Sequence, residues 1–256
     1  MSSIAEEIQR LKDAKSNIKT SIQNKGVSVD DTATLDAYPA LIDSIEQTGG
    51  GFKIAETGVK LAYSSFSEVP DGLDFDGVTD MGNMFYYCEL LQTIPQLDTS
   101  QVTNMSHMFN GCHYLQSIPM LDTSQVTNMS SMFNFCNRLQ TIPQLDTSQV
   151  NSMSYMFIHC SNLQSVPQLD TSQVNSSPIN MFSSCSNLTD LGGFVGLKVN
   201  LDLSSCPLTH DSIMNVINKA ADVTELPQTI TLGPTNLAKL TDEQKSIATN
   251  KGWTLA

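Results

Sequence analysis

Apolar residues recur along the middle of the chain with a period of 24 residues, and the repeats start at Leu73, Leu97, Leu121, Leu145 and Leu169. One unit reads LDTSQVTNMSHMFNGCHYLQSIPM and the next LDTSQVTNMSSMFNFCNRLQTIPQ, while the units at the two ends are more degenerate. The apolar columns are the leucine of LDTS, the valine of QVTN, Met-x-x-Met-Phe, the cysteine and Leu-x-x-Ile-Pro. A fixed period of this length predicts a solenoid, in which each coil buries its apolar side by stacking on its neighbours.

The fold predicted by the repeats is an α/β solenoid: a leucine-rich-repeat-like, right-handed stack of five 24-residue coils with a parallel sheet along one face. The proline of each Ile-Pro step removes a backbone donor at the same place in every coil. We therefore expect each strand to be short and to lie beside that proline. The spacing of Val102, Met105, Met108 and Phe109 favours a short helical or 3₁₀ segment with one face turned inward.

A helical hairpin is predicted ahead of the repeats. Its first helix, within residues 2–24, carries a heptad-like apolar stripe, and its second spans about Thr34 to Glu46. The stripe consists of Ile4, Ile8, Leu11, Ile18 and Ile22. Three consecutive glycines at 49–51 indicate a hinge after the hairpin. A hairpin this small buries little apolar surface, so we expect it to form a homo-oligomer, with a trimer favoured. Packing of the hairpin on the first coil is the alternative.

Four segments follow from these patterns. They are a helical attachment or oligomerisation module (1–50), an N-terminal cap of the solenoid (51–72), the solenoid itself (73–193) and a small α/β C-terminal cap (194–256). In the C-terminal cap, an amphipathic stretch predicts a helix with Thr209 or Asp211 as N-cap. Residues 229–232 indicate a strand, and a capped helix is predicted from Thr241 to Lys251.

Charge narrows the range of partners. The 256 residues carry a formal charge of −13, and Arg138 is the sole basic residue between Leu73 and Gly193, against nine acids there. Nucleic acid is therefore not an expected partner, because no basic face could neutralise phosphates. The sequence has no run of 18 apolar residues and no signal-peptide pattern at its start, so neither membrane insertion nor classical export is expected.

The repeat unit LDTSxVTNMSxMFxxCxxLxxIPQ resembles that of the BspA-like leucine-rich-repeat proteins of bacterial surfaces and bacteriophage virions. Residues 4–45 are similar to N-terminal modules of phage tail-fibre and other appendage proteins, and the C-terminal stretch resembles the ends of related phage and gut-bacterial proteins. The resemblance implies a bacteriophage virion appendage, of tail- or head-fibre type, that recognises a host-surface glycan or protein. Residues 1–50 would then bind other virion proteins. The alternative is a bacterial cell-surface adhesin that binds protein or glycan.

Catalysis has no support in the sequence. It contains no GxSxG, HExxH, P-loop or GxGxxG motif. A capsule-depolymerising glycosidase would need two converging carboxylates, and the sequence offers no way to select such a pair. We therefore expect a protein that is not an enzyme and that uses no cofactor.

Cysteine and aspartate also recur with the repeat. The cysteines are Cys88, Cys112, Cys136, Cys160, Cys185 and Cys206. Buried free thiols are favoured over disulfides, because stacked side chains that point the same way lack the geometry for a bridge. The aspartates are Asp98, Asp122, Asp146 and Asp170. Each can accept the backbone N–H two residues on in a turn, while a calcium-binding column is the alternative. The four histidines lack metal-ligand spacing, so no metal site is expected.

Candidate ligand-binding residues come from the columns that vary between repeats. The varying positions that carry aromatic, histidine or arginine side chains are Tyr86, Tyr87, His107, His113, Tyr114, Phe135, Arg138, Tyr155 and His159. Such side chains suit stacking on sugars or protein, and they vary where the scaffold fixes everything else. Neutral drift on a solvated face would give the same pattern, and this alternative stays open.

Overall fold

The computed structural model describes residues 52–53, 60–69 and 73–256. The predicted N-terminal hairpin, the glycine hinge and the apolar stripe lie outside the described residues; the stripe is Ile4, Ile8, Leu11, Ile18 and Ile22. The described residues fall into two compact units. The smaller unit holds 52–53, 60, 69 and 73–78, and the larger holds 61–68 and 79–256.

The smaller unit contains one short parallel pair of strands. Strand β1 (Phe52–Lys53) pairs with β2 (Leu73–Asp74), and Phe52 lies opposite Leu73. A turn follows β2, in which the Val78 N–H donates to the Phe75 carbonyl at 3.2 Å.

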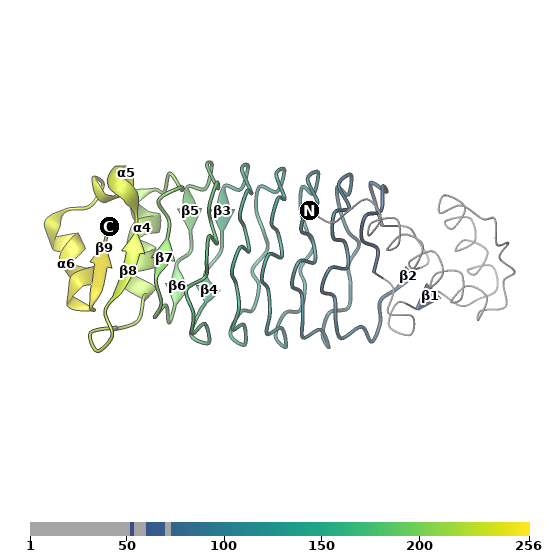
Figure 1. The fold of residues 1–256 in the computed structure, drawn as a ribbon, viewed down its shortest axis with the longest axis horizontal. Coiled ribbons are helices and arrows are strands. Elements are labelled where there is room, and N and C mark those ends of the chain that lie inside the picture. The colour runs from purple at the N-terminus through teal and green to yellow at the C-terminus, as the bar shows by residue number, and fades with distance from the viewer. Residues whose placement is uncertain (1–51, 54–59, 70–72) are drawn as a thin grey trace, which may run out of the picture. The chain divides into compact units, whose positions relative to one another are not determined.

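The larger unit is a stack of coils that lie side by side (Figure 1). Its short strands are β3 (Ser165–Val166), β4 (Leu169–Asp170), β5 (Asp190–Leu191) and β6 (Phe194–Val195). The pairs β3–β5 and β4–β6 are parallel, and isolated parallel bridges join earlier coils, such as Asn104 with Asn128. Strands β3 and β4 lie on either side of Pro167, which confirms the prediction of brief strands beside the proline.

Each coil turns sharply around its Met-Phe group, and this segment was expected to be helical. That expectation is wrong. The N–H groups of Met105, His107, Phe109 and Gly111 donate to carbonyls of the next coil at 2.8–3.0 Å, and only the intervening residues bond within their own coil. His107 and Gly111 have positive φ, at 56° and 79°. A helix cannot persist, because left-handed residues interrupt it and half of its donors point out of the coil.

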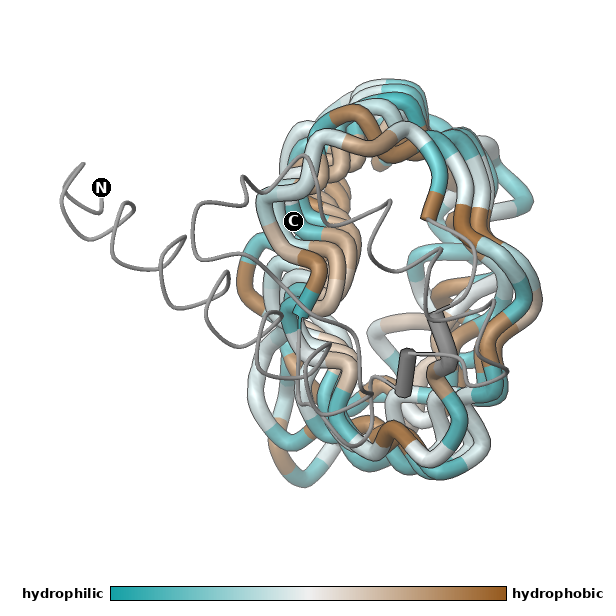
Figure 2. The backbone as a smooth tube through the Cα atoms, turned by 90° about the vertical axis from the view of Figure 1, so that its right-hand side faces the viewer, coloured by the Kyte–Doolittle hydropathy of each residue, from teal (hydrophilic) through white to brown (hydrophobic). Residues whose placement is uncertain are grey.

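The core consists of side-chain columns that run through the stack, so residues of like hydropathy superpose when the coils are viewed end on (Figure 2). The central column contains Phe85, Phe109, Phe133, Phe157 and Phe182, each at most 1% exposed. Adjacent rings are stacked, with centroids 5.5–5.7 Å apart and planes within 11°. The buried methionines Met108 and Met132 adjoin this column in sequence, so the inward placement of the Met-Phe pair is confirmed.

The cysteines form a second buried column. All six are free thiols, as predicted. Four of them donate to a phenylalanine carbonyl of the previous coil at 3.0–3.1 Å, as Cys136 does to Phe109. Burial raises the pKa of the Cys88 thiol to about 12 and raises the pKa of the other five as well. These thiols pack the core and bridge consecutive coils.

The cysteines should therefore resist thiol reagents while the protein is folded. A rise in the Cys88 pKa from 9.0 to about 12 lowers its thiolate population about a thousandfold, and the thiolate is the reactive species. Titration with a disulfide reagent at pH 8 should modify none of the six cysteines in native protein and all six in guanidinium. Modification of even one cysteine at a rate faster than global unfolding would contradict the buried placement.

The Asp-Thr-Ser corner is a turn. Asp98, Asp122, Asp146 and Asp170 each accept the backbone N–H of the serine two residues on at 2.9–3.0 Å. The backbone hydrogen bond lowers the pKa of the first three carboxyls. This is the turn-capping role that the sequence predicted, and it accounts for the aspartates without a cation.

The C-terminal part of the larger unit is a small parallel sheet with three helices (Figure 1). The sheet has the order β7 (Leu201–Asp202), β8 (Gln228–Thr231), β9 (Trp253–Leu255), and the helices are α4 (His210–Lys219), α5 (Gly233–Leu237) and α6 (Asp242–Asn250). The predicted helix and strand elements of this region are confirmed within one or two residues, with Thr209 as the N-cap of α4. Helix α5 and the pairing of β7 and β9 with β8 were not foreseen.

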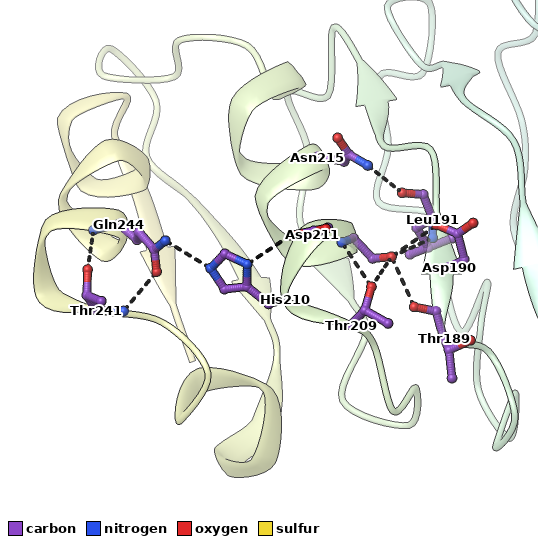
Figure 3. Close-up of polar contacts among 10 residues, drawn as sticks. Thr189, Asp190, Leu191, Thr209, His210, Asp211, Asn215, Thr241 and Gln244 are labelled. Carbon is purple, nitrogen blue, oxygen red and sulfur yellow. Dashed lines mark hydrogen bonds and ion pairs between the residues drawn. The ribbon is translucent and has the colours of Figure 1, made fainter.

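Polar contacts, buried around Ser212 and exposed around His210, fix α4 against its neighbours (Figure 3). The Ser212 hydroxyl donates to the Thr189 carbonyl and accepts the Leu191 N–H, both at 3.0 Å. At the N-terminus of α4, His210 Nδ1 lies 3.1 Å from Asp211 Oδ1, and its Nε2 lies 2.9 Å from Gln244 on α6. The hydrogen bond to Asp211 raises the pKa of His210. These contacts join the last coil, α4 and α6.

Candidate ligand-binding ridge

Rings from successive coils form a continuous line, which we call the aromatic ridge. It comprises Tyr63, Tyr86, Tyr87, His107, His113, Phe135 and His159. Neighbouring ring centroids are 4.3–6.3 Å apart, with the shortest distance between Phe135 and His159. All but Tyr63 are half-buried, and Tyr63 is exposed. The ridge therefore presents partly exposed aromatic and imidazole rings along several consecutive coils.

One column of the ridge has a left-handed backbone conformation that favours glycine, although mostly aromatic residues occupy it. This column has Tyr63, Tyr87, Gly111, Phe135 and His159 at successive coils, with φ between 54° and 79°. A non-glycine residue in this left-handed region costs roughly 1–2 kcal/mol, and bulky aromatic residues are uncommon there. In the one coil with glycine, a Cβ would lie 2.8 Å from the Tyr87 ring, so that ring fills the vacated space. Ring contacts offset the cost in the other coils.

Two asparagines hold the ridge histidines. Asn137 donates from Nδ2 to the His159 carbonyl at 3.2 Å, which leaves its Oδ1 to face His113 Nδ1 at 2.8 Å. The proton of His113 therefore resides on Nδ1, and Nε2 is left as the acceptor of the neutral ring. Asn110 Nδ2 lies 3.0 Å from His107 Nδ1. Burial lowers the pKa of His107, which favours its neutral form.

A cation and an aromatic ring lie directly beside the ridge. The guanidinium carbon of Arg138 lies 4.2 Å from the centroid of the Tyr114 ring. Tyr114 is 39% exposed and follows His113 in one coil, while Arg138 follows Asn137 in the next. Among the described residues no carboxylate lies within ion-pair distance of Arg138. Within the described part of the chain, the partner of this cation is therefore the Tyr114 ring.

The structure brings most of the candidate residues together. Six lie in the ridge, and Tyr114 and Arg138 lie beside it. Tyr155 is separate: it is 38% exposed and forms no ring contact among the residues that the structure describes.

Sequence reasoning missed Tyr63 and Asn137. Tyr63 stands 24 residues before Tyr87, so extension of the repeat by one degenerate coil would have found it. Asn137 gave no comparable signal, because its role depends on contacts with two other coils.

The described residues offer no metal cluster, since no three histidine, cysteine, aspartate or glutamate side chains are grouped to hold an ion. No helix in the described ranges is both long and apolar enough to cross a membrane. The groups on and beside the ridge are aromatic and imidazole rings, two asparagine amides and the Arg138 guanidinium.

The stacked coils and the ridge define a repeat-scaffold protein of the solenoid class. The sequence matches the family described as "Mycoplasma protein of unknown function, DUF285" over residues 63–137 and 79–194, which together span more than half of the chain. The chain belongs to this family. The match supports the BspA-like resemblance of the repeat unit, and it begins at the degenerate coil that contains Tyr63.

Among solved structures, the crystal structure of a leucine-rich repeat protein from T. pallidum is similar at 20% identity with a TM-score of 0.45. The alignment covers 77% of this chain and 86% of that one. No curated protein matches the sequence.

Proposed function

We propose that the protein is a non-enzymatic recognition scaffold that binds a surface glycan or protein through the aromatic ridge. The observation that carries this proposal is the presence of aromatic rings at backbone positions that favour glycine. A solenoid needs only the buried columns and the backbone ladder for its fold. Rings that stay partly exposed at backbone positions that favour glycine point to a role in binding.

Phe135→Gly should separate binding from stability. Glycine relieves roughly 1–2 kcal/mol of left-handed strain, which offsets the lost contacts with His113 and His159. We expect the free energy of unfolding to change by about 1 kcal/mol or less, because Gly111 already serves at this position in another coil. Binding to intact host cells, measured by flow cytometry of labelled protein, should fall about tenfold.

The matched control is Ser184→Gly, which removes a small side chain from the same left-handed column outside the ridge. It should leave binding unchanged. If Phe135→Gly bound cells as the unaltered protein does, the ridge would not be the recognition surface.

Two settings suit such a scaffold. A bacteriophage virion appendage is supported by the resemblance of residues 4–45 to phage appendage modules. A bacterial cell-surface adhesin is supported by the family assignment, whose description names a bacterium. Labelled antibody should decorate purified virions in the first setting and intact uninfected cells in the second. If the antibody labelled neither virions nor cells, both the virion-appendage and the cell-surface setting would be refuted.

Residues 1–50 are proposed to assemble the protein as a homo-oligomer, with a trimer favoured, and to contact other virion proteins if the appendage setting is right. The support is the apolar heptad-like stripe that includes Ile8 and Leu11. Sedimentation should give a multiple of the 27.9 kDa chain mass, and the double variant Ile8→Asp/Leu11→Asp should sediment as a monomer. A monomeric unaltered chain would refute the proposal.

A further inference from the structure

We propose that the ridge binds an acidic polysaccharide and that Arg138 binds a carboxylate of the sugar chain. This inference rests on the proposed function and names its ligand class. The site consists of four residues beside the rings of the ridge. His113 and Tyr114 are consecutive in one coil, and Asn137 and Arg138 occupy the same positions in the next coil.

Charge is segregated around the coils. Arg138 and all three histidines of the solenoid lie on or beside the ridge, while the aspartates of the Asp-Thr-Ser turns occupy a different corner of each coil. Of the nine acids between Leu73 and Gly193, only Glu89 stands in the columns that flank the cysteines, one coil before His113. The protein has a charge of −13, yet no carboxylate of the described residues pairs with Arg138, and the face around it is depleted of acids. Such a face is complementary to an anionic ligand.

The ridge is not built to capture a peptide backbone. The N–H groups of Tyr87, Gly111, Phe135 and His159 all donate to the next coil at 2.7–3.0 Å, and the carbonyls of intervening residues accept from the previous one. A peptide therefore finds no free strand edge to extend. Recognition must come from side chains alone.

The side chains present are those that suit a sugar acid. The planar guanidinium of Arg138 can donate two parallel hydrogen bonds to a carboxylate. The His113 ring is held through Nδ1 by Asn137, so its Nε2 faces away from that contact and can hydrogen-bond a sugar hydroxyl. The exposed Tyr114 ring adds apolar surface against the sugar ring. Together these groups bind one acidic sugar residue, and the rings of the ridge contact the adjacent sugars of the chain.

The test is the binding of the full-length protein to uronate polymers (polygalacturonate, alginate and hyaluronate), each paired with its carboxyl-reduced neutral counterpart. Calorimetry should show at least tenfold tighter binding to one acidic polymer than to its neutral partner. Arg138→Gln should abolish that difference, because the neutral amide of glutamine cannot make the charge-assisted hydrogen bonds that arginine makes to a carboxylate. Lys198→Gln, which removes one positive charge from the segment between β6 and β7, should leave the difference unchanged.

Each other outcome overturns the inference in a distinct way. Equal binding to acidic and neutral polymers that still depends on Phe135 would refute the carboxylate site and leave the proposed function intact. Tighter binding to polyglutamate than to any uronate polymer, lost in Arg138→Gln, would identify an acidic protein as the ligand. No binding to any of the uronate polymers, or equal losses in Arg138→Gln and Lys198→Gln, would refute Arg138 as a specific site.

Discussion

Phe133→Ala should lower the free energy of unfolding by about 3–5 kcal/mol, the range typical of a buried phenylalanine truncated to alanine. Phe133 is fully buried and lies between two stacked rings, with centroids 5.7 Å from Phe109 and 5.5 Å from Phe157. Its neighbours belong to other coils and are held by backbone ladders, so they cannot collapse into the cavity. Urea unfolding followed by circular dichroism measures the change.

Phe133→Leu is the control, because it keeps most of the apolar volume and loses only the ring stacking. It should cost clearly less than the alanine variant. Phe135→Gly, two residues away and half-buried, should cost least of the three. If Phe133→Ala and Phe135→Gly lowered stability equally, the division between a core column and a recognition ridge would be wrong.

Gly192→Ala should destabilise the protein by about 3 kcal/mol, at the upper end of overpacking costs. A Cβ on Gly192 would lie 2.3 Å from the Gln168 backbone nitrogen and 2.8 Å from the Pro167 carbonyl carbon. Those atoms belong to the previous coil, which the Gly192 N–H also contacts through the Val166 carbonyl at 2.9 Å. The chain cannot shift there without breaking the pairing of β3 with β5.

Gly82→Ala provides the comparison. A Cβ there would lie 2.7 Å from Asn104 Nδ2, which is the far end of a half-exposed side chain rather than backbone. Rotation of Asn104 should limit the cost to about 1 kcal/mol. Differential scanning calorimetry of both variants tests the contrast, and a Gly192→Ala protein that melts no lower than Gly82→Ala would show that the coils can separate locally.

The buried columns could be read from the sequence because a solenoid repeats its contacts at the period of its sequence. Phe133, Cys136 and Asp122 each occupy the role that their spacing indicated: core, free thiol and turn cap. The C-terminal helices were also predictable, since Thr209 and the Thr241–Gln244 capping box are local signals.

The turn around Met105 and the ridge were harder to predict, because their backbone is set by hydrogen bonds between coils. An i, i+3 apolar spacing is the same for a helix and for a turn with left-handed residues, and only the neighbouring coil decides between them. The partnership of Asn137 with His113 and His159 likewise spans three coils. Variation between repeats located the ridge residues without indicating which of them touch.

The backbone hydrogen bonds between successive turns also align the peptide dipoles beneath the ridge. In each turn the N–H groups that leave the coil, such as those of His107 and Gly111, all point toward the next coil, and the carbonyls of Ser106 and Asn110 point toward the previous one. Within the turns, peptide dipoles of about 3.5 D therefore share one direction along the stack, while N–H groups elsewhere in the coil, such as that of Thr103, donate to the previous coil. The positive end faces the last coils, on the side of His159. We therefore expect an anionic group on the ridge to be held more favourably near His159 than near Tyr87.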